Sequence, residues 1–273
     1  MIASWIEKTF SSFELLLQDI YKILDLMSSS PEAEEMSSSI EFLYELSKVN
    51  STAAFLLWQT QRQRRLATWL NLPDTQIVTS QLFFKMREEK LVVLKNGLGT
   101  LLNSDSKLKI IEKPLAFREL EWFEQISISG QNFSYDPIEL EDILKDELIF
   151  KSAIIAGAKY KSFQLAYDYS TKRIQGGRKI MNWSSVQSQL SELFLSVKAD
   201  ASLMKDMNLE NAFTILKDAD HFVSQNMQVL GGAGYMEDYI VERLYRECIF
   251  LKNWPLPYKE QLMYYFQREV MPS

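Results

Sequence analysis

The stretch Gln228–Arg246 constrains the fold more than any other part of the chain. It reads Gln-Val-Leu-Gly-Gly-Ala-Gly-Tyr-Met-Glu-Asp-Tyr-Ile-Val-Glu-Arg-Leu-Tyr-Arg, and its glycines directly follow an apolar run with helical spacing. Glycine allows a tight turn and a close approach to another backbone or to a ligand. A Gly-Gly pair alone indicates a helix C-cap, whereas the whole run predicts two helices joined by a tight turn. The glycines of this turn are Gly231, Gly232 and Gly234.

The composition limits the class of protein. A chain of 273 residues with 47% hydrophobic residues can bury a sizeable core. Its net charge of −6 argues against nonspecific nucleic-acid binding, which needs a basic surface. The single cysteine, Cys248, cannot form an internal disulfide, so we expect a cytoplasmic protein. We expect no signal peptide, no membrane span and no metal site, because no segment or residue spacing typical of these features occurs.

The texture of the chain changes twice. Apolar residues recur at helical spacing in Trp5–Met27 and again in Ile40–Leu57. Short β-rich runs separated by turn residues then follow from Gln76 to Phe133. From Pro137 onward the pattern is helical again. We therefore expect a mainly α protein with a small, largely antiparallel β domain: an N-terminal helical domain over 1–75, a β domain over 76–136 and a C-terminal helical domain over 137–273.

Two motifs resemble the acyl-CoA dehydrogenase family. The first is the glycine turn of Gln228–Arg246, which matches the family's Gly-Gly-x-Gly-Tyr turn and the Val-Glu-Arg-Leu-Tyr-Arg helix after it. The second lies around Tyr169 and Arg173, where the family has Tyr-x-x-x-Arg followed by x-x-Phe-Gly-Lys-x-Ile, although Gly176 takes the place of the phenylalanine. The resemblance implies N-terminal helices, a reduced middle antiparallel sheet and a C-terminal four-helix bundle.

The resemblance also implies FAD as cofactor. The arginine at the position of Arg173 binds the FAD pyrophosphate in the family, and a guanidinium suits this role because it donates in a fixed fork. Arg173 could instead satisfy carbonyls at the end of its own helix. Gln228, Gly231 and Gly232 match positions that contact the FAD of a neighbouring subunit in the family, so a homo-oligomer or a hetero-oligomer with another family member is expected. Gln187 matches a glutamine of the family helix and is a further expected cofactor-binding residue.

The predicted β domain departs from the family pattern. Asn96–Ser104 only weakly resembles the family's Asn-Gly-x-Lys-x-aromatic-Ile-Thr segment, with Gly99 at the lysine and Leu101 at the aromatic position. The Thr-Glu-Pro and Gly-Ser-Asp motifs, which line the flavin and substrate cleft, have no counterpart in the chain. We therefore expect a β domain that has been cut down.

The catalytic base is expected at Glu147. The usual family position for the glutamate base falls on Pro255, and proline can neither take a proton nor donate a backbone N–H. A minority of the family carries the base on the helix that opens the last domain, and this position falls on Glu147. Glu147 could instead belong to a solvated acidic helix start. The basic cluster at Arg62, Arg64 and Arg65 suggests a solvated face or, as an alternative, a phosphate contact.

Three functions remain open from the sequence. The chain could oxidise an acyl-CoA or acyl-carrier-protein thioester by α-proton abstraction with β-hydride transfer to FAD, passing electrons to a transfer partner. Alternatively, it could be a catalytically silent subunit that completes a partner's flavin site, or a flavin-free structural relative. The lost β-domain motifs and Pro255 favour the alternatives.

Overall fold

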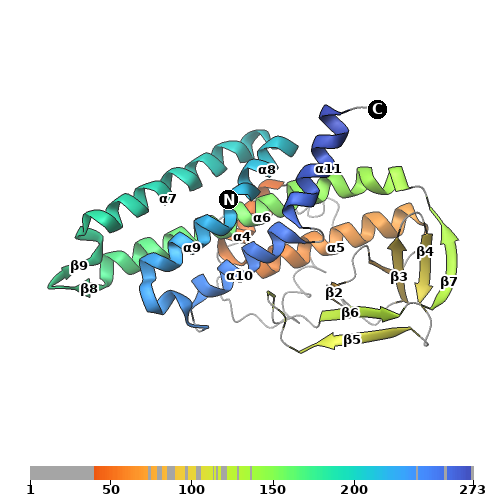
Figure 1. The fold of residues 1–273 in the computed structure, drawn as a ribbon, viewed down its shortest axis with the longest axis horizontal. Helices are drawn as coiled ribbons and strands as arrows, with labels where there is room; N and C mark the ends of the chain where they lie inside the picture. Colours follow the sequence, from red (N-terminus) through yellow and green to blue (C-terminus); the bar gives the residue numbers. More distant parts are fainter. Residues whose placement is uncertain are drawn as a thin grey trace. The chain divides into compact units, whose positions relative to one another are not determined.

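The computed structural model describes residues 40–72, 137–237, 239–254 and 257–271, together with short segments between 75 and 135 (Figure 1). The predicted helix over Trp5–Met27 and the position of Pro255 lie outside the described residues. The chain divides into a helical unit, which runs up to Leu57 and resumes at Leu148, and a β unit between them. The division into three domains stays a prediction.

The helical unit contains α-helices joined by short 3₁₀ turns and one small hairpin. Its elements are α4 (Ile40–Val49), the start of α5 (Ser51–Trp69), most of α6 (Pro137–Lys172), β8 (Ile174–Gln175), β9 (Arg178–Lys179), η1 (Ile180–Asn182), α7 (Ser184–Leu203), η2 (Met204–Asp206), α8 (Leu209–Lys217), α9 (Ala219–Leu230), η3 (Gly231–Tyr235), α10 (Ile240–Asn253) and α11 (Tyr258–Val270).

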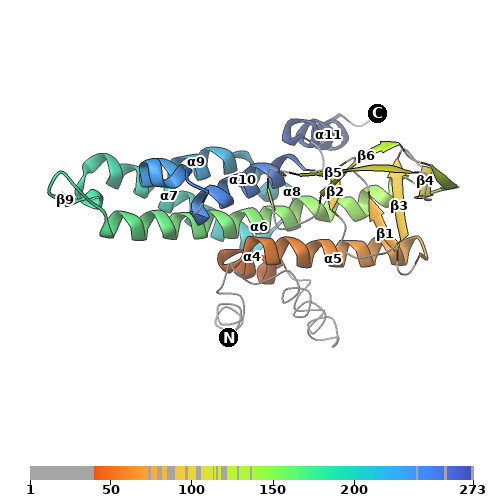
Figure 2. The ribbon, with the colours of Figure 1, turned by 90° about the horizontal axis from the view of Figure 1, so that it is seen from below.

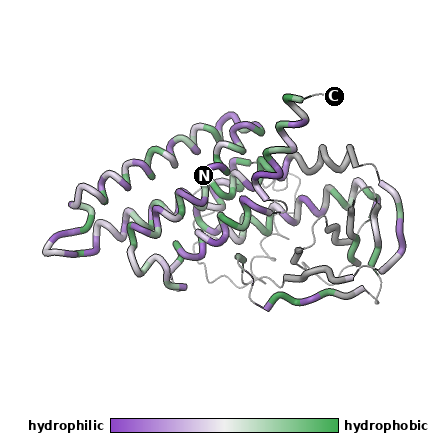
Figure 3. The backbone as a smooth tube through the Cα atoms, in the orientation of Figure 1, coloured by the Kyte–Doolittle hydropathy of each residue, from purple (hydrophilic) through white to green (hydrophobic). Residues whose placement is uncertain are grey.

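Within this unit α6, α7, α9 and α10 run side by side, as the predicted C-terminal four-helix bundle requires (Figures 1 and 2). Hydrophobic and hydrophilic residues alternate along these helices (Figure 3), which is the pattern of amphipathic helices that bury one face. The predicted apolar faces are confirmed at Leu190, Leu193 and Val197 of α7, all of which are buried. Cys248 on α10 is fully buried, whereas His221 on α9 is exposed and does not pack into the bundle.

Small residues let α4 and α6 approach closely. A Cβ atom added at Gly157 would lie 2.5 Å from the carbonyl oxygen of Tyr44, so no larger residue fits there. The Ser47 hydroxyl donates to the carbonyl oxygen of Ile154 at 2.5 Å across the same contact. Between α4 and α5, Asn50 accepts a hydrogen bond from the backbone N–H of Ala53, which caps the start of the second helix.

Buried charges in the helical unit are paired across helices. The ammonium of Lys159 on α6 is fully buried and lies 2.7 Å from Asp200 on α7 and 2.8 Å from Asp218, which precedes α9. Glu247 on α10 is fully buried and accepts hydrogen bonds from Nε of Arg243 in the same helix, at 2.8 Å, and from the hydroxyl of Ser51 at the start of α5. An unpaired buried charge would cost several kcal/mol, so these pairs select one arrangement of the helices.

The β unit holds two sheets instead of the single sheet expected. One has the strand order β1-β3-β4-β7 and the other β2-β6-β5. The pairs are antiparallel except for β1 and β3, which are parallel, so the largely antiparallel prediction is confirmed with one exception. The strands are β1 (Thr75–Val78), β2 (Leu82–Phe84), β3 (Lys90–Lys95), β4 (Leu98–Leu102), β5 (Lys107–Ile111), β6 (Trp122–Ser127) and β7 (Gly130–Ser134).

The predicted fold class, mainly α with a small β part, is confirmed by this arrangement. Parallel strands that alternate with helices, the arrangement that would contradict the prediction, do not occur among the described strands. None of the helices in the described part of the chain is both long enough and apolar enough to cross a membrane.

The buried carboxyl of Asp200 predicts a pH dependence of stability. Burial raises the pKa of Asp200 from 3.8 to about 6, against the opposing effect of the Lys159 ammonium. The folded protein therefore binds a proton more tightly than the unfolded chain, so stability falls as pH rises from about 4 to about 6. Lowering the pH from 7 to 5 should stabilise the wild type by ~1 kcal/mol relative to Asp200→Asn, as measured by urea unfolding.

The control for this prediction is Asp168→Asn, which changes an exposed carboxyl on α6. This variant should follow the wild-type pH dependence, because the side chain of Asp168 is exposed and takes no part in the buried Lys159–Asp200 pair. Equal changes in stability between pH 7 and pH 5 for the wild type and Asp200→Asn would contradict the assignment.

Candidate functional site

Arg173 stands directly after α6, where the chain turns into the β8–β9 hairpin. Its backbone N–H donates to the carbonyl of Tyr169 at 2.9 Å, and its carbonyl accepts from the N–H of Ile180 at 2.9 Å. These two bonds fix the backbone on either side of the hairpin. The Arg173 side chain is exposed, so its guanidinium is accessible to a ligand, as the FAD prediction requires.

The hairpin after Arg173 presents an aromatic ring that the sequence did not indicate as a site residue. Gly176 and Gly177 both have positive φ, at 59° and 77°, which glycine adopts without strain. The ring of Trp183 lies 3.2 Å from the place where a Cβ of Gly176 would stand. The guanidinium of Arg178 stacks on the same ring, 3.6 Å from its centroid. An aromatic surface therefore lies beside the glycine that replaces the family's phenylalanine.

Gln187 and Gln228 lie at the same end of the helical unit. Gln187 is exposed in the first turn of α7, and Gln228 is exposed in the last turn of α9. Two residues after Gln187, the amide of Gln189 donates to the side chain of Gln225 at 2.7 Å and to its carbonyl at 2.9 Å, and Gln225 lies three residues before Gln228. The amide of Gln228 is itself oriented by a 3.0 Å hydrogen bond to the hydroxyl of Tyr235.

The glycine turn contains two physically different kinds of glycine. Gly231 has a φ of 61° and a ψ of −140°, a conformation that other residues rarely adopt. A Cβ at Gly231 or Gly232 would meet nothing within 4 Å, so the turn leaves its backbone open to an approaching group. At Gly234, by contrast, a Cβ would lie 2.7 Å from the carbonyl oxygen of Met227, so this glycine is required by close packing.

The structure gathers the cofactor-binding candidates of the helical unit at one end of its bundle. The C-terminal end of α6, the hairpin, the start of α7 and the end of α9 with η3 lie there (Figures 1 and 2). An exposed guanidinium, two exposed amides and an open glycine backbone supply the donors that bind phosphate oxygens and a nucleotide. These residues fit the group that the resemblance implies.

Glu147 is not on a solvated helix start, the alternative considered from the sequence. It lies in the β unit, is 5% exposed and accepts a hydrogen bond at Oε1 from Nε of Arg62, which is 6% exposed. Arg62 is therefore neither a solvated arginine nor a phosphate ligand; the side chains of Arg64 and Arg65 are not described. The guanidinium of Arg62 therefore already occupies one oxygen of the carboxylate that was predicted to act as the base.

The family's usual base position is flanked by packed side chains. Trp254, which precedes Pro255, is 7% exposed and packs edge-on against Phe55 with ring centroids 6.1 Å apart. Its carbonyl accepts a hydrogen bond at 3.1 Å from the ammonium of Lys151, a side chain that is 1% exposed. Lys151 also donates to Gln261 on α11. The burial of Lys151 was not predictable from the sequence, because nothing in the apolar periodicity of α6 marks this lysine as buried.

Solved structures share this fold at low sequence identity. Butyryl-CoA dehydrogenase from Megasphaera elsdenii is 14% identical, with a TM-score of 0.69 over 96% of this chain and 94% of that one. A chain of the electron transferring flavoprotein structure from Acidaminococcus fermentans is 14% identical, with a TM-score of 0.71 over 100% and 96%. Acyl-CoA dehydrogenase from Geobacillus kaustophilus is 13% identical, with a TM-score of 0.65 over 98% and 96%.

No protein-family model and no curated protein sequence matches the chain. The likeness therefore rests on structure, and the chain has the acyl-CoA dehydrogenase-like fold. The resemblance identified in the glycine turn and around Arg173 is confirmed at the level of the fold.

The two kinds of glycine predict different effects of the same substitution. Gly234→Ala should destabilise the protein by ~1–3 kcal/mol, because the added methyl group meets the Met227 carbonyl and the backbone must shift. Gly232→Ala is the matched control and should change stability by less than ~0.5 kcal/mol, since its Cβ meets nothing. Chemical unfolding of both variants measures the difference, and equal effects would show that the turn is not packed as described.

Proposed function

We propose that the chain is an acyl-CoA dehydrogenase-like flavoprotein that binds FAD at the exposed end of its helical unit and oxidises an acyl thioester. The observation that carries this proposal is the gathering of Arg173, Gln187, Gln228 and the glycine turn at one accessible end of a bundle with this fold. Related folds belong to proteins named for butyryl-CoA and glutaryl-CoA dehydrogenation, which supports an acyl thioester as substrate class.

Each residue at this end would hold the cofactor through a specific property. The guanidinium of Arg173 would donate to the pyrophosphate in a fork. The amide of Gln228, oriented by Tyr235, and the open backbone at Gly231 would contact the nucleotide part, with Gln187 as a further amide donor. When bound, FAD supplies the acceptor for the β-hydride. A second copy of the chain, or another subunit of this fold, would complete the site. An electron-transferring protein would reoxidise the reduced flavin.

Glu147 would act as the base that removes the α-proton of the thioester. It is a buried carboxylate, and burial away from water strengthens the interactions of a catalytic group. Arg62 already donates to Oε1 of this carboxylate, so this hydrogen bond must be exchanged before that oxygen can accept a proton.

A second candidate function is a catalytically silent subunit that binds flavin without oxidising substrate. Two observations favour it. Arg62 already occupies Oε1 of the Glu147 carboxylate, and the ammonium of Lys151 donates to the carbonyl that precedes Pro255. Both contacts stabilise the fold without needing a substrate. The two functions differ in flavin reduction and agree on flavin binding.

Arg173→Gln tests cofactor binding. Loss of a charge-assisted, two-pronged contact should weaken FAD binding ~10–100-fold, as measured by quenching of flavin fluorescence. Lys172→Gln removes a neighbouring exposed charge on α6 and should bind FAD with wild-type affinity. A colourless wild-type protein that gains no thermal stability from added FAD would refute flavin binding by this chain.

Glu147→Gln tests the base. The variant keeps the size of the side chain but cannot accept the α-proton, so anaerobic flavin reduction by butyryl-CoA should slow at least ~100-fold while FAD affinity stays unchanged. Glu192→Gln, an exposed position on α7, is the control and should reduce flavin at the wild-type rate. If the wild type binds FAD and shows no reduction with acyl thioesters, the silent-subunit function replaces the oxidoreductase.

A further inference from the structure

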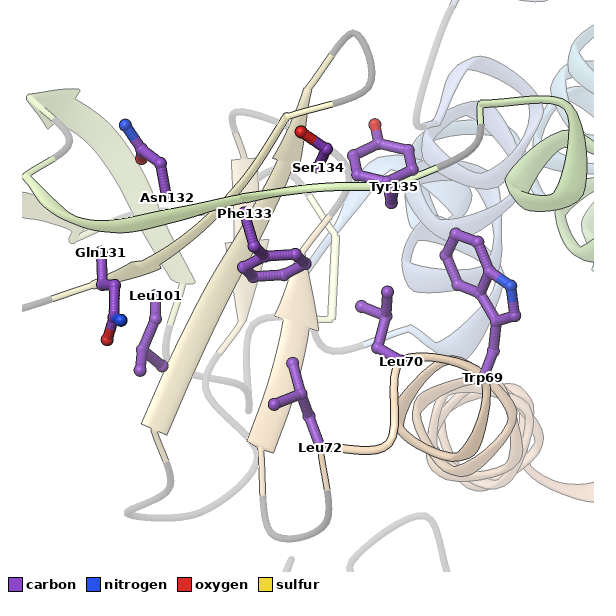
Figure 4. Close-up of a pocket in the computed structure, with 9 residues that line it drawn as sticks. All are labelled: Trp69, Leu70, Leu72, Leu101, Gln131, Asn132, Phe133, Ser134 and Tyr135. Atoms are coloured by element: carbon purple, nitrogen blue, oxygen red, sulfur yellow. The ribbon is translucent and has the colours of Figure 1, made fainter.

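The β unit contains a cavity that none of the residues discussed so far uses. Its volume is about 520 Å³, and it lies between the end of α5 and the inner face of the β4–β7 pair (Figure 4). Volumes of ~300–1,000 Å³ are typical of small-molecule sites in proteins. The apolar and aromatic part of its wall is supplied by Trp69, Leu70 and Leu72 from the helix end and by Leu101, Phe133 and Tyr135 from the sheet side.

The helix side of the cavity is built by a specific turn. Asn71 has a φ of 52°, the left-handed conformation that ends many helices. The N–H of Leu72 donates to the carbonyl of Ala67 at 2.9 Å, and the N–H of Leu70 donates to that of Leu66 at 3.0 Å. This turn satisfies the last carbonyls of α5 and folds Leu70 and Leu72 back toward the sheet. The apolar wall is therefore held in place by backbone hydrogen bonds.

The sheet side presents one face of two paired strands. Leu101 on β4 is opposite Gln131 on β7, and Gly99 is opposite Phe133, so these four residues share the cavity face. The ring of Phe133 covers Gly99 so closely that a Cβ there would lie 2.2 Å from Cζ of the ring. Because glycine contributes no side chain, the ring lies flat against the strand and leaves space between the sheet and the helix end.

The same apolar side chains line the small core of the β unit. Leu66 and Val92 are fully buried, and Leu70, Leu101 and Phe133 pack against them. Trp69 and Tyr135 meet edge to face at 5.8 Å on one flank. The cavity thus extends outward from this core as a cleft whose described lining residues are half-buried or exposed, and a ligand there would cover apolar surface of Trp69, Leu72 and Phe133.

The chemistry of the walls selects a neutral ligand. None of the nine described residues that line the cavity is charged, so a phosphate or carboxylate would enter without a counter-charge. Figure 4 shows Asn132 and Ser134 pointing to the other side of β7, and Asn132 is already bonded to the hydroxyl of Thr100 at 2.8 Å. Gln131 stands on the cavity face and is exposed, so its amide can bond one polar group of the ligand at the mouth.

We infer that the cavity binds one neutral, mainly apolar small molecule, with a single hydrogen-bonding group directed to the amide of Gln131. This site goes beyond the proposed flavin function, because the described residues that line it belong to the β unit and none of them carries a charge that would pair with a pyrophosphate. Its occupancy does not depend on FAD.

The test uses N-phenyl-1-naphthylamine, a neutral apolar probe that becomes fluorescent in apolar sites. The full-length wild type should bind one probe per chain with saturation in the micromolar range. Leu101→Trp fills the cavity face and should weaken binding at least ~10-fold. Leu102→Trp is the matched control, because the next residue of β4 faces the opposite side of the sheet, and it should leave probe affinity within ~2-fold of the wild type.

Two further measurements complete the test. Leu72→Phe places a larger side chain on the helix side of the cavity and should also weaken probe binding. This variant tests the site even if Leu101→Trp does not fold. 1-Anilinonaphthalene-8-sulfonate carries the same aromatic skeleton with a negative charge and should bind at least ~10-fold more weakly. Absence of saturable probe binding, equal binding by the two tryptophan variants, or equal binding of the charged probe would overturn the proposal, whatever the outcome with FAD.

Discussion

The pairing of Lys159 determines how the helical unit is assembled. Its ammonium is fully buried on α6 and reaches Asp200 on α7 and Asp218 at the start of α9. A cation that is buried away from water needs its carboxylate partners. Sliding one of these helices along another would therefore leave the Lys159 ammonium or one of its carboxylates buried without a partner. The end of α9 and the start of α7 then meet at Gln189 and Gln225, and this contact brings the cofactor-binding candidates to one end.

A buried charge needs a partner at Glu147 too, but here the partner limits what the residue can do in catalysis. Its pairing with Arg62 explains why a carboxylate can be buried in the β unit. A carboxylate that stabilises the fold in this way has one oxygen occupied, whereas a catalytic base needs an oxygen that is accessible to the proton of the substrate. The chain therefore combines an accessible end that suits a cofactor with a candidate base that already has a strong partner.

The glycine residues illustrate how similar sequence signals lead to different physical roles. Gly231 is needed for its backbone conformation, Gly234 for its contact with Met227, and Gly99 because the ring of Phe133 lies on it. Only the first role leaves an open surface. The presence of glycine at position 99 also contributes to the cavity. A side chain there would displace the ring of Phe133 and fill the space beside it.

Local pattern determined the fold class, because helical and strand periodicity depend on neighbouring residues alone. The helix over α7, the glycine turn after α9 and the short strands between Gln76 and Phe133 were predictable for this reason. Only the tertiary structure decided that Arg62 and Lys151 are buried, that the strands form two sheets and that a cavity remains beside Phe133. These features depend on partners far apart in the sequence, such as Lys151 and Gln261, which are 110 residues apart, and such pairings leave no local signal.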